Sequence, residues 1–222
     1  MPVEFKLKQA LYDRKRGYMP LESINFNAFL GRPGYPEDPI ERMVFGPLES
    51  NDPMNVWPEK PETLARNGQA LFKSMQSLSD KVIAVLASIT DREEELRRAC
   101  QNGQNMMKVN FYPGTQSPKP LQSDRLTAHL DASAFTIVAN YGAVGGLQAK
   151  NKNGDWVSIN PIPGTLFLNL GWVLEKVVDG KWKATIHKVG WSSSDDMTRD
   201  RLSVVYFVSQ TRFVDETSKV DA

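Results

Sequence analysis

The feature that most limits the possible folds is a series of short apolar, β-branched segments after residue 105, separated by turn residues. Side chains of a strand point alternately to its two faces, so short alternating segments bounded by Gly, Pro and Asn predict strands. The turns include 151–154 (Asn-Lys-Asn-Gly) and 161–164 (Pro-Ile-Pro-Gly). Eight such segments predict a sandwich, a jelly roll or a barrel. The expected strands are 107–112, 126–129, 135–139, 146–150, 156–159, 165–170, 185–189 and 202–208.

Residues 1–105 carry a different pattern, which predicts an irregular and helical segment before a β domain at 106–222. Gly and Pro are frequent between residues 17 and 61, so long helices or strands are not expected there. Further on, apolar residues recur at steps of three and four, as on one face of a helix: Leu71, Met75, Leu78, Val82, Val85 and Ile89. This face is expected to pack on the sheet, which gives a mixed α and β fold.

Composition narrows the classes of function. The 222 residues carry a formal net charge of +1, with 24% charged and 41% hydrophobic residues. There is no basic stripe for a nucleic-acid partner, and no run of about 18 apolar residues for a membrane. The first residues lack the apolar stretch of a secretory signal. Cys100 is the only cysteine, so no internal disulfide can form. These features favour a cytoplasmic protein and leave its oligomeric state open.

The chain has only two histidines, His129 and His187, so any histidine chemistry depends on these positions. His129 and Asp131 are two residues apart at an expected strand, so their side chains share a face. His187 lies on a later expected strand and can reach the same place. Two imidazoles and one carboxylate with open positions beside them are the ligand set of non-haem iron(II) oxygenases. A hydrogen-bonded His–Asp pair without metal is the alternative interpretation.

Two polar residues at the start of the last expected strand, Arg201 and Ser203, are also two residues apart. An arginine can donate two hydrogen bonds to a carboxylate, and a serine hydroxyl adds another donor. Such a pair could hold one end of a dicarboxylate whose other end chelates the metal. An edge-strand arginine that faces solvent is the simpler alternative.

In their order along the chain, these residues resemble the isopenicillin N synthase-like branch of the 2-oxoglutarate/iron(II) dioxygenases. The H-x-D…H motif of that family matches His129, Asp131 and His187, and its R-x-S motif matches Arg201 and Ser203. The resemblance covers nearly the whole chain. Further matching segments are 15–18, 55–58, 110–113, 144–148, 155–156, 161–164, 169–171 and 181–189.

The resemblance implies a double-stranded β-helix, or jelly roll, backed by a long helix. It implies that iron(II) is held by three residues, which are thereby both metal-binding and catalytic: His129, Asp131 and His187. It also implies that 2-oxoglutarate is contacted by Arg201, Ser203 and Tyr112, and that O2 is the oxidant. The implied oxidoreductase hydroxylates, desaturates or cyclises a small-molecule substrate and releases succinate and CO2.

Two other functions remain open. In an oxidase like isopenicillin N synthase, the Arg201–Ser203 pair would hold the carboxylate of the substrate, and 2-oxoglutarate would not be used. The second is a truncated, non-catalytic jelly roll that serves as a binding protein, because the segment before Gly17 is short for the family. Five aromatic residues are candidates for the substrate pocket or for ordinary packing: Phe135, Tyr141, Trp172, Trp191 and Phe207.

Overall fold

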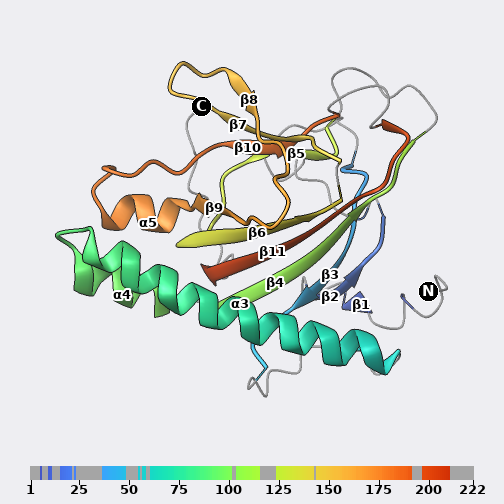
Figure 1. Cartoon of the computed structure of the whole chain (residues 1–222), viewed down its shortest axis with the longest axis horizontal. Helices are drawn as coiled ribbons and strands as arrows, with labels where there is room; N and C mark the ends of the chain where they lie inside the picture. The colour runs from blue at the N-terminus through green and yellow to red at the C-terminus, as the bar shows by residue number, and fades with distance from the viewer. Residues whose placement is uncertain are drawn as a thin grey trace.

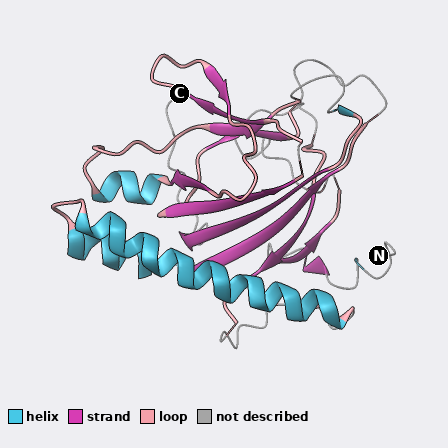
Figure 2. Ribbon diagram, viewed as in Figure 1, coloured by secondary structure: helices cyan, strands magenta, loops and turns pink. Residues whose placement is uncertain are grey.

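The computed structural model describes residues 6, 10–11, 16–21, 23, 37–48, 55, 57–58, 61–101, 104–115, 124–142, 144–191 and 197–210. Within these residues the chain forms two antiparallel sheets and a set of helices (Figures 1 and 2). The helices are α3 (Glu62–Ser88), α4 (Glu93–Gln101) and α5 (Trp172–Val177). The strands are β1 (Ala10–Leu11), β2 (Arg16–Met19), β3 (Glu41–Phe45), β4 (Gln104–Tyr112), β5 (Leu126–His129), β6 (Phe135–Tyr141), β7 (Leu147–Lys150), β8 (Trp156–Ser158), β9 (Phe167–Leu170), β10 (His187–Val189) and β11 (Arg201–Gln210).

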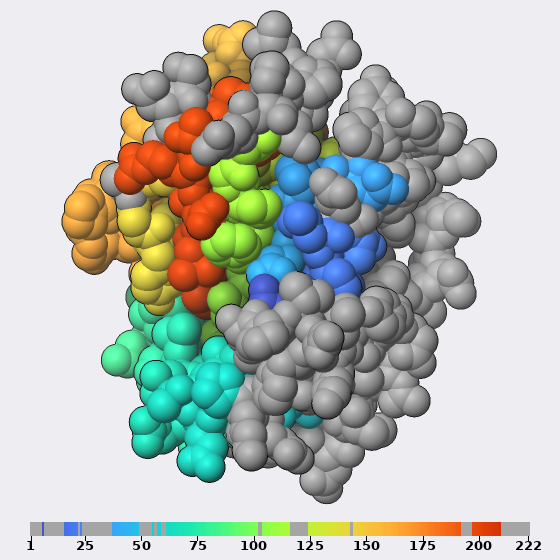
Figure 3. All heavy atoms as spheres, turned by 90° about the vertical axis from the view of Figure 1, so that its right-hand side faces the viewer, coloured from blue at the N-terminus to red at the C-terminus, as the bar shows by residue number. Residues whose placement is uncertain are grey.

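The two sheets form the expected jelly roll. The larger sheet has the strand order β1-β2-β3-β4-β11-β6-β9, and the smaller sheet has the order β5-β10-β7-β8. Figure 3 shows part of the larger sheet, with β6, β11, β4 and β3 side by side in yellow, red, green and blue. The smaller sheet lies on one side of the larger sheet, and helix α3 runs along the other side (Figure 2). The eight strands expected after residue 105 all occur, as β4 to β11.

Because side chains alternate along each strand, the two faces of the larger sheet carry different residues. In β11, Val204, Tyr206 and Val208 belong to the hydrophobic core that includes helix α3. The intervening side chains of Ser203 and Val205 line a pocket instead. β4 and β6 pair with β11 on either side, and the same alternation continues across them. One face of the sheet therefore builds the core, and the other face builds a pocket.

Helix α3 packs on the core face. The ring of Phe72 meets the ring of Tyr206 edge-on, with 5.2 Å between their centroids. Full burial of a side chain such as Phe72 stabilises the fold by about 2 kcal/mol. The predicted helix is confirmed, but its expected packing face is wrong near the C-terminal end, where Val85 and Ile89 are 61% and 63% exposed. Leu86 is buried there instead, so this end of the helix packs through a different face from the one expected.

The N-terminal half contributes three short strands that its Gly and Pro content did not predict. β1 pairs with β2, β2 with β3, and β3 with β4, so the larger sheet crosses the expected boundary near residue 105. β3 is only five residues long and lies between Pro39 and Gly46. Pairing with β4 supplies the hydrogen bonds that make a strand of this short segment. It also places Arg42 opposite Asn110.

Helix α5 is a further element that the strand and helix patterns did not predict. It is six residues long and follows Gly171, between β9 and β10. None of the helices in the described part of the chain is both long and apolar enough to cross a membrane.

Candidate metal centre

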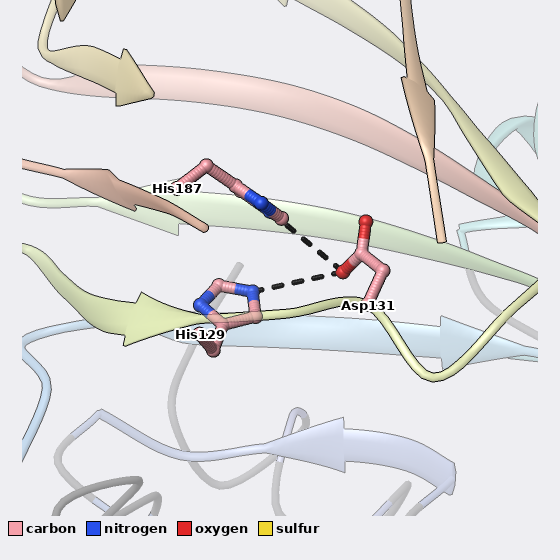
Figure 4. Close-up of side chains that lie close together, drawn as sticks. All are labelled: His129, Asp131 and His187. Carbon is pink, nitrogen blue, oxygen red and sulfur yellow. Dashed lines mark ion pairs between the residues drawn. The ribbon is translucent and has the colours of Figure 1, made fainter. Parts of the chain in front are cut away.

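Two neighbouring strands of the smaller sheet bring the two histidines together. β10 pairs with β5 so that His187 lies opposite His129. Asp131 follows the end of β5 by two residues, and its carboxylate turns toward both imidazoles (Figure 4). One ligand atom from each residue lies within 4.8 Å of the others. The structure thus brings the three predicted ligand residues into one cluster.

Hydrogen bonds determine which nitrogen of each imidazole faces this cluster. Nδ1 of His129 lies 2.7 Å from the backbone oxygen of Thr127, and Nδ1 of His187 lies 2.9 Å from that of Thr185. Because a carbonyl oxygen only accepts, each Nδ1 carries the proton and each Nε2 presents a lone pair. Each Nε2 is 3.7 Å from Oδ1 of Asp131, which is too long for a hydrogen bond. The geometry therefore fits an ion between the three groups better than a His–Asp hydrogen bond.

Asp131 is held in place through its second oxygen. Oδ2 accepts hydrogen bonds from the Thr136 hydroxyl and from the Asn169 amide, both at 2.7 Å. Burial alone would raise the pKa of Asp131, but His187, His129 and these two hydrogen bonds hold that pKa below its ordinary value. Burial, reinforced by His187, lowers the pKa of His129 to about 4. At neutral pH the cluster therefore offers an ionised carboxylate and a neutral His129, as metal binding requires.

Thr136→Val removes one hydrogen bond to Asp131 and keeps the shape of the side chain. We expect iron(II) affinity to fall about 10- to 100-fold, the usual cost of losing a partner of a metal ligand. Equilibrium dialysis with iron(II) under argon measures this affinity. Thr165→Val is the matched control, because the Thr165 hydroxyl bonds only to the exposed turn at Ile162. Equal iron affinity in Thr136→Val and the control would show that the carboxylate needs no such orientation.

Arg201, Ser203 and Tyr112 line the same pocket as the His–Asp–His cluster. Arg201 is only 2% exposed, so the alternative of a solvent-facing arginine is wrong. Its guanidinium donates to the backbone oxygen of Gly145 at 3.1 Å, to the Ser203 hydroxyl at 3.2 Å and to the side-chain oxygen of Asn140. The guanidinium carbon also lies 5.0 Å from the centroid of the Tyr112 ring. These contacts hold a buried cation at the pocket wall.

Gly146 lets the chain adopt the loop conformation whose backbone contacts Arg201. Gly146 has a φ of +100°, a conformation that favours glycine. A Cβ at this position would lie 2.5 Å from the backbone oxygen of Gly190. The loop at 144–146 therefore supports the site through its backbone, since the neighbouring Gly145 carbonyl accepts from Arg201.

Of the five aromatic candidates for the pocket, Phe207 is the one that the described residues place in its lining. Phe135 instead belongs to the core on the helix side of the larger sheet. The two residues lie on β11 and β6, and strand alternation accounts for the difference. Phe207 has the parity of Ser203, whereas Phe135 has the parity of the core residue Ile137.

Two cations of the pocket were missed by reasoning from the sequence. Lys108 and Arg42 line the pocket together with the His–Asp–His cluster. Lys108 could have been found, because it lies at i−2 from Asn110 and i−4 from Tyr112 on one strand and therefore shares their face. Arg42 carried no such signal, because β3 itself was not predicted.

Comparison with known proteins shows which proteins this chain is similar to. A profile of the 2OG-Fe(II) oxygenase superfamily matches residues 103–210. Flavanone 3-dioxygenase 2 of Oryza sativa subsp. japonica is 30% identical over 153 residues, which are 68% of this chain and 43% of that protein. A solved Caulobacter crescentus protein of the 2OG-Fe(II) oxygenase family is 26% identical with a TM-score of 0.76, covering 95% of this chain and 69% of that one. A full-length Neurospora crassa protein, solved in complex with alpha-KG, shares the fold with a TM-score of 0.76 at 23% identity, over 94% of this chain and 65% of that one.

The two facing sheets form a jelly roll, and the cluster of two histidines and one carboxylate has the arrangement of a group that can hold a metal ion. Together with the profile and sequence matches, they show that the chain belongs to the 2OG-Fe(II) oxygenase superfamily. Iron(II) and 2-oxoglutarate give this superfamily its name, and its members are oxidoreductases. The chain spans less than half the length of the first curated relatives it matches, 43% and 44%.

Proposed function

We propose that this chain is the catalytic part of an oxygenase that uses iron(II), 2-oxoglutarate and O2. It would hydroxylate, desaturate or cyclise a small molecule and release succinate and CO2. The observation that carries this proposal is a single pocket lined both by the His–Asp–His cluster and by the buried Arg201. A dicarboxylate cosubstrate needs both, because one end chelates the metal and the other end needs a cation.

The donor set fits iron(II). His129 and His187 each present Nε2, and Asp131 presents Oδ1, so three ligands come from one side and other positions remain for further ligands. Bound iron(II), with 2-oxoglutarate and O2, supplies the oxidant that removes hydrogen from the substrate. The chain itself holds the reactants, orients them and shields them from water. We therefore assign these three residues as the iron ligands.

We assign Arg201, Ser203 and Tyr112 to the far carboxylate of 2-oxoglutarate. The guanidinium supplies charge and hydrogen bonds, and a serine hydroxyl can donate beside it. Because Arg201 is already held by Gly145 and Asn140, little side-chain freedom is lost when the cosubstrate binds.

Three finer assignments accompany this proposal. The order of the matching segments supports the isopenicillin N synthase-like branch. The buried, unpaired thiol of Cys100 supports a reducing compartment such as the cytoplasm, which localisation of the tagged protein would test. The Neurospora crassa protein has also been solved with thymine, a small molecule, which supports a small-molecule substrate here.

The proposed function is tested by measuring succinate from 2-oxoglutarate with the purified chain, iron(II), ascorbate and O2. We expect succinate to form only when iron(II) and 2-oxoglutarate are both present, slowly without substrate and faster when a substrate is added. The Asp131→Ala protein gives the background. Succinate no higher than this background would contradict the proposal. O2 consumption that does not require 2-oxoglutarate would instead indicate an oxidase.

A further inference from the structure

The pocket carries more positive charge than the proposed iron and cosubstrate can balance. The charged side chains among the described residues that line it are Arg42, Lys108, Asp131 and Arg201. Iron(II) and the 2-oxoglutarate dianion cancel each other, and Asp131 balances Arg201. Arg42 and Lys108 then have no anion to balance them within the lining, although Asp38, outside the lining, partly favours the charge of Arg42. Because burying an unpaired charge is costly, a further anionic partner is expected.

Arg42 has the features of a binding residue without its ligand. It is 5% exposed, and its Nε and Nη2 have no hydrogen-bond partner. Asp38 favours the charge of Arg42 without forming an ion pair with it, and Oδ1 of Asp38 accepts two hydrogen bonds from Thr127. Two buried donor nitrogens without a partner, on a side chain that lines a pocket, indicate a missing acceptor.

Lys108 adds a second cation to the same region. Its ammonium lies 4.3 Å from the ring centroid of Phe207, and Asp131 favours its charge without forming an ion pair with it. Burial, reinforced by the charge of Arg42, lowers the pKa of Lys108 to about 7. Two cations that disfavour each other's charge would both be stabilised by one anion between or beside them.

The rest of the lining indicates the body of the ligand. Apolar side chains cover much of the pocket wall: Leu126, Leu130, Val138, Leu147, Val189, Val205 and Phe207. A ligand that satisfies Arg42 and also fills this space has an acidic head and an apolar body.

We propose that Arg42, assisted by Lys108, binds a carboxylate of the substrate, so that the substrates are small carboxylic acids with an apolar body. The inference rests on the proposed function, which gives Arg201 to the cosubstrate. The substrate carboxylate accepts hydrogen bonds from the two unpaired nitrogens of Arg42, and the two cations offset its charge. Arg42 is thus a specificity-determining residue of the oxygenase.

The test uses the full chain loaded with zinc(II) in place of iron and with saturating 2-oxoglutarate. Loading is checked first by dialysis, so a failure to bind metal or cosubstrate counts against the proposed function rather than this inference. Ligand-observed NMR then measures the binding of phenylacetate and hexanoate and of their neutral amides. Retention of 2-oxoglutarate is followed in the same samples.

We expect each acid to bind at least about 10-fold more tightly than its amide, because hydrogen bonds to charged groups are strong. Arg42→Met should remove most of this preference, and Lys108→Met should remove a smaller part. Zinc and 2-oxoglutarate affinities should stay within about twofold of wild type in Arg42→Met. Arg98→Gln, which removes a charge on the exposed face of helix α4, should change none of these affinities.

Thermal unfolding distinguishes a role of Arg42 in substrate recognition from a role in stabilising the fold. A recognition residue with unpaired donors adds little to stability, so the melting temperature of Arg42→Met should equal or exceed that of wild type. Equal binding of acids and amides, or a preference that survives Arg42→Met, would overturn the inference. Displacement of 2-oxoglutarate by the acids would place their carboxylate at Arg201 and would overturn it as well. A lower melting temperature together with lost metal binding in Arg42→Met would also overturn the inference.

Discussion

Replacing Asp131 with alanine is expected to lower iron(II) affinity by more than about 100-fold, beyond the usual cost of losing an outer partner of a ligand. Oδ1 of Asp131 is the only charged donor that the cluster offers, and it lies 3.7 Å from both imidazole nitrogens. His129→Ala and His187→Ala should have similar effects, because the chain has no other histidine to replace them. Succinate production should disappear together with iron binding in all three variants.

The matched control for this series is Asp155→Ala, which removes a carboxylate from the exposed turn between β7 and β8. Circular dichroism and thermal unfolding of the metal-free proteins should show that all four variants are folded. Equilibrium dialysis with iron(II) under argon then compares their affinities. Wild-type iron affinity or full turnover in any of the three cluster variants would exclude that residue as a ligand.

Arg201→Ala is expected to raise the dissociation constant for 2-oxoglutarate by about 10- to 100-fold, since hydrogen bonds to a charged group contribute about 1.5 to 3 kcal/mol. Iron(II) affinity should persist, because the guanidinium makes no hydrogen bond to the cluster residues. Arg201→Lys should lie between wild type and alanine, since an ammonium keeps the charge but cannot form the paired hydrogen bonds. Titration of the iron-loaded proteins with 2-oxoglutarate measures these constants.

Arg199→Ala is the control for Arg201, because it removes an exposed arginine two residues away. Its 2-oxoglutarate affinity should match that of wild type. If Arg201→Ala also binds 2-oxoglutarate normally, Arg201 does not hold the cosubstrate. Turnover that needs no 2-oxoglutarate in the wild-type protein and is lost in Arg201→Ala would favour an oxidase in which this arginine holds the substrate.

Strands with alternating side chains were the part of the fold that the sequence predicted best. β5 has the same bounds as the expected strand at 126–129, and β4 and β11 are slightly longer than expected. These strands are buried on two chemically different faces, so their polar and apolar residues alternate clearly. Phe207 and Val208 illustrate this, since one lines the pocket and the other lies in the core.

The elements that were missed depend on contacts distant in sequence. β3 becomes a strand because β4 lies beside it, and no local pattern announces that pairing. The six residues of α5, Trp172–Val177, include β-branched and aromatic residues that are weak helix formers. Its first residue, Trp172, donates a backbone hydrogen bond to the carbonyl of Asp131 at 3.1 Å. A helix that the sequence did not predict therefore helps to place a predicted iron ligand.

The same limit applies to the site. Strand spacing, together with the resemblance, predicted His129, Asp131 and His187 as ligands, and the structure brings these three residues together. The partners of Asp131 could not be selected, because Asn169 is 38 residues away and Thr136 lies on the next strand. Single threonines and asparagines are also too common to be recognised as partners of a ligand.

The most direct test of the proposed site is an anaerobic titration of the wild-type protein, first with iron(II) and then with 2-oxoglutarate, followed by visible absorption. We predict that one equivalent of iron(II) binds without a visible band and that 2-oxoglutarate then produces a weak charge-transfer band. The band should be lost in Asp131→Ala and should require more 2-oxoglutarate in Arg201→Ala. Bound iron and bound 2-oxoglutarate without this band, or no iron binding at all, would contradict the assignment of the pocket.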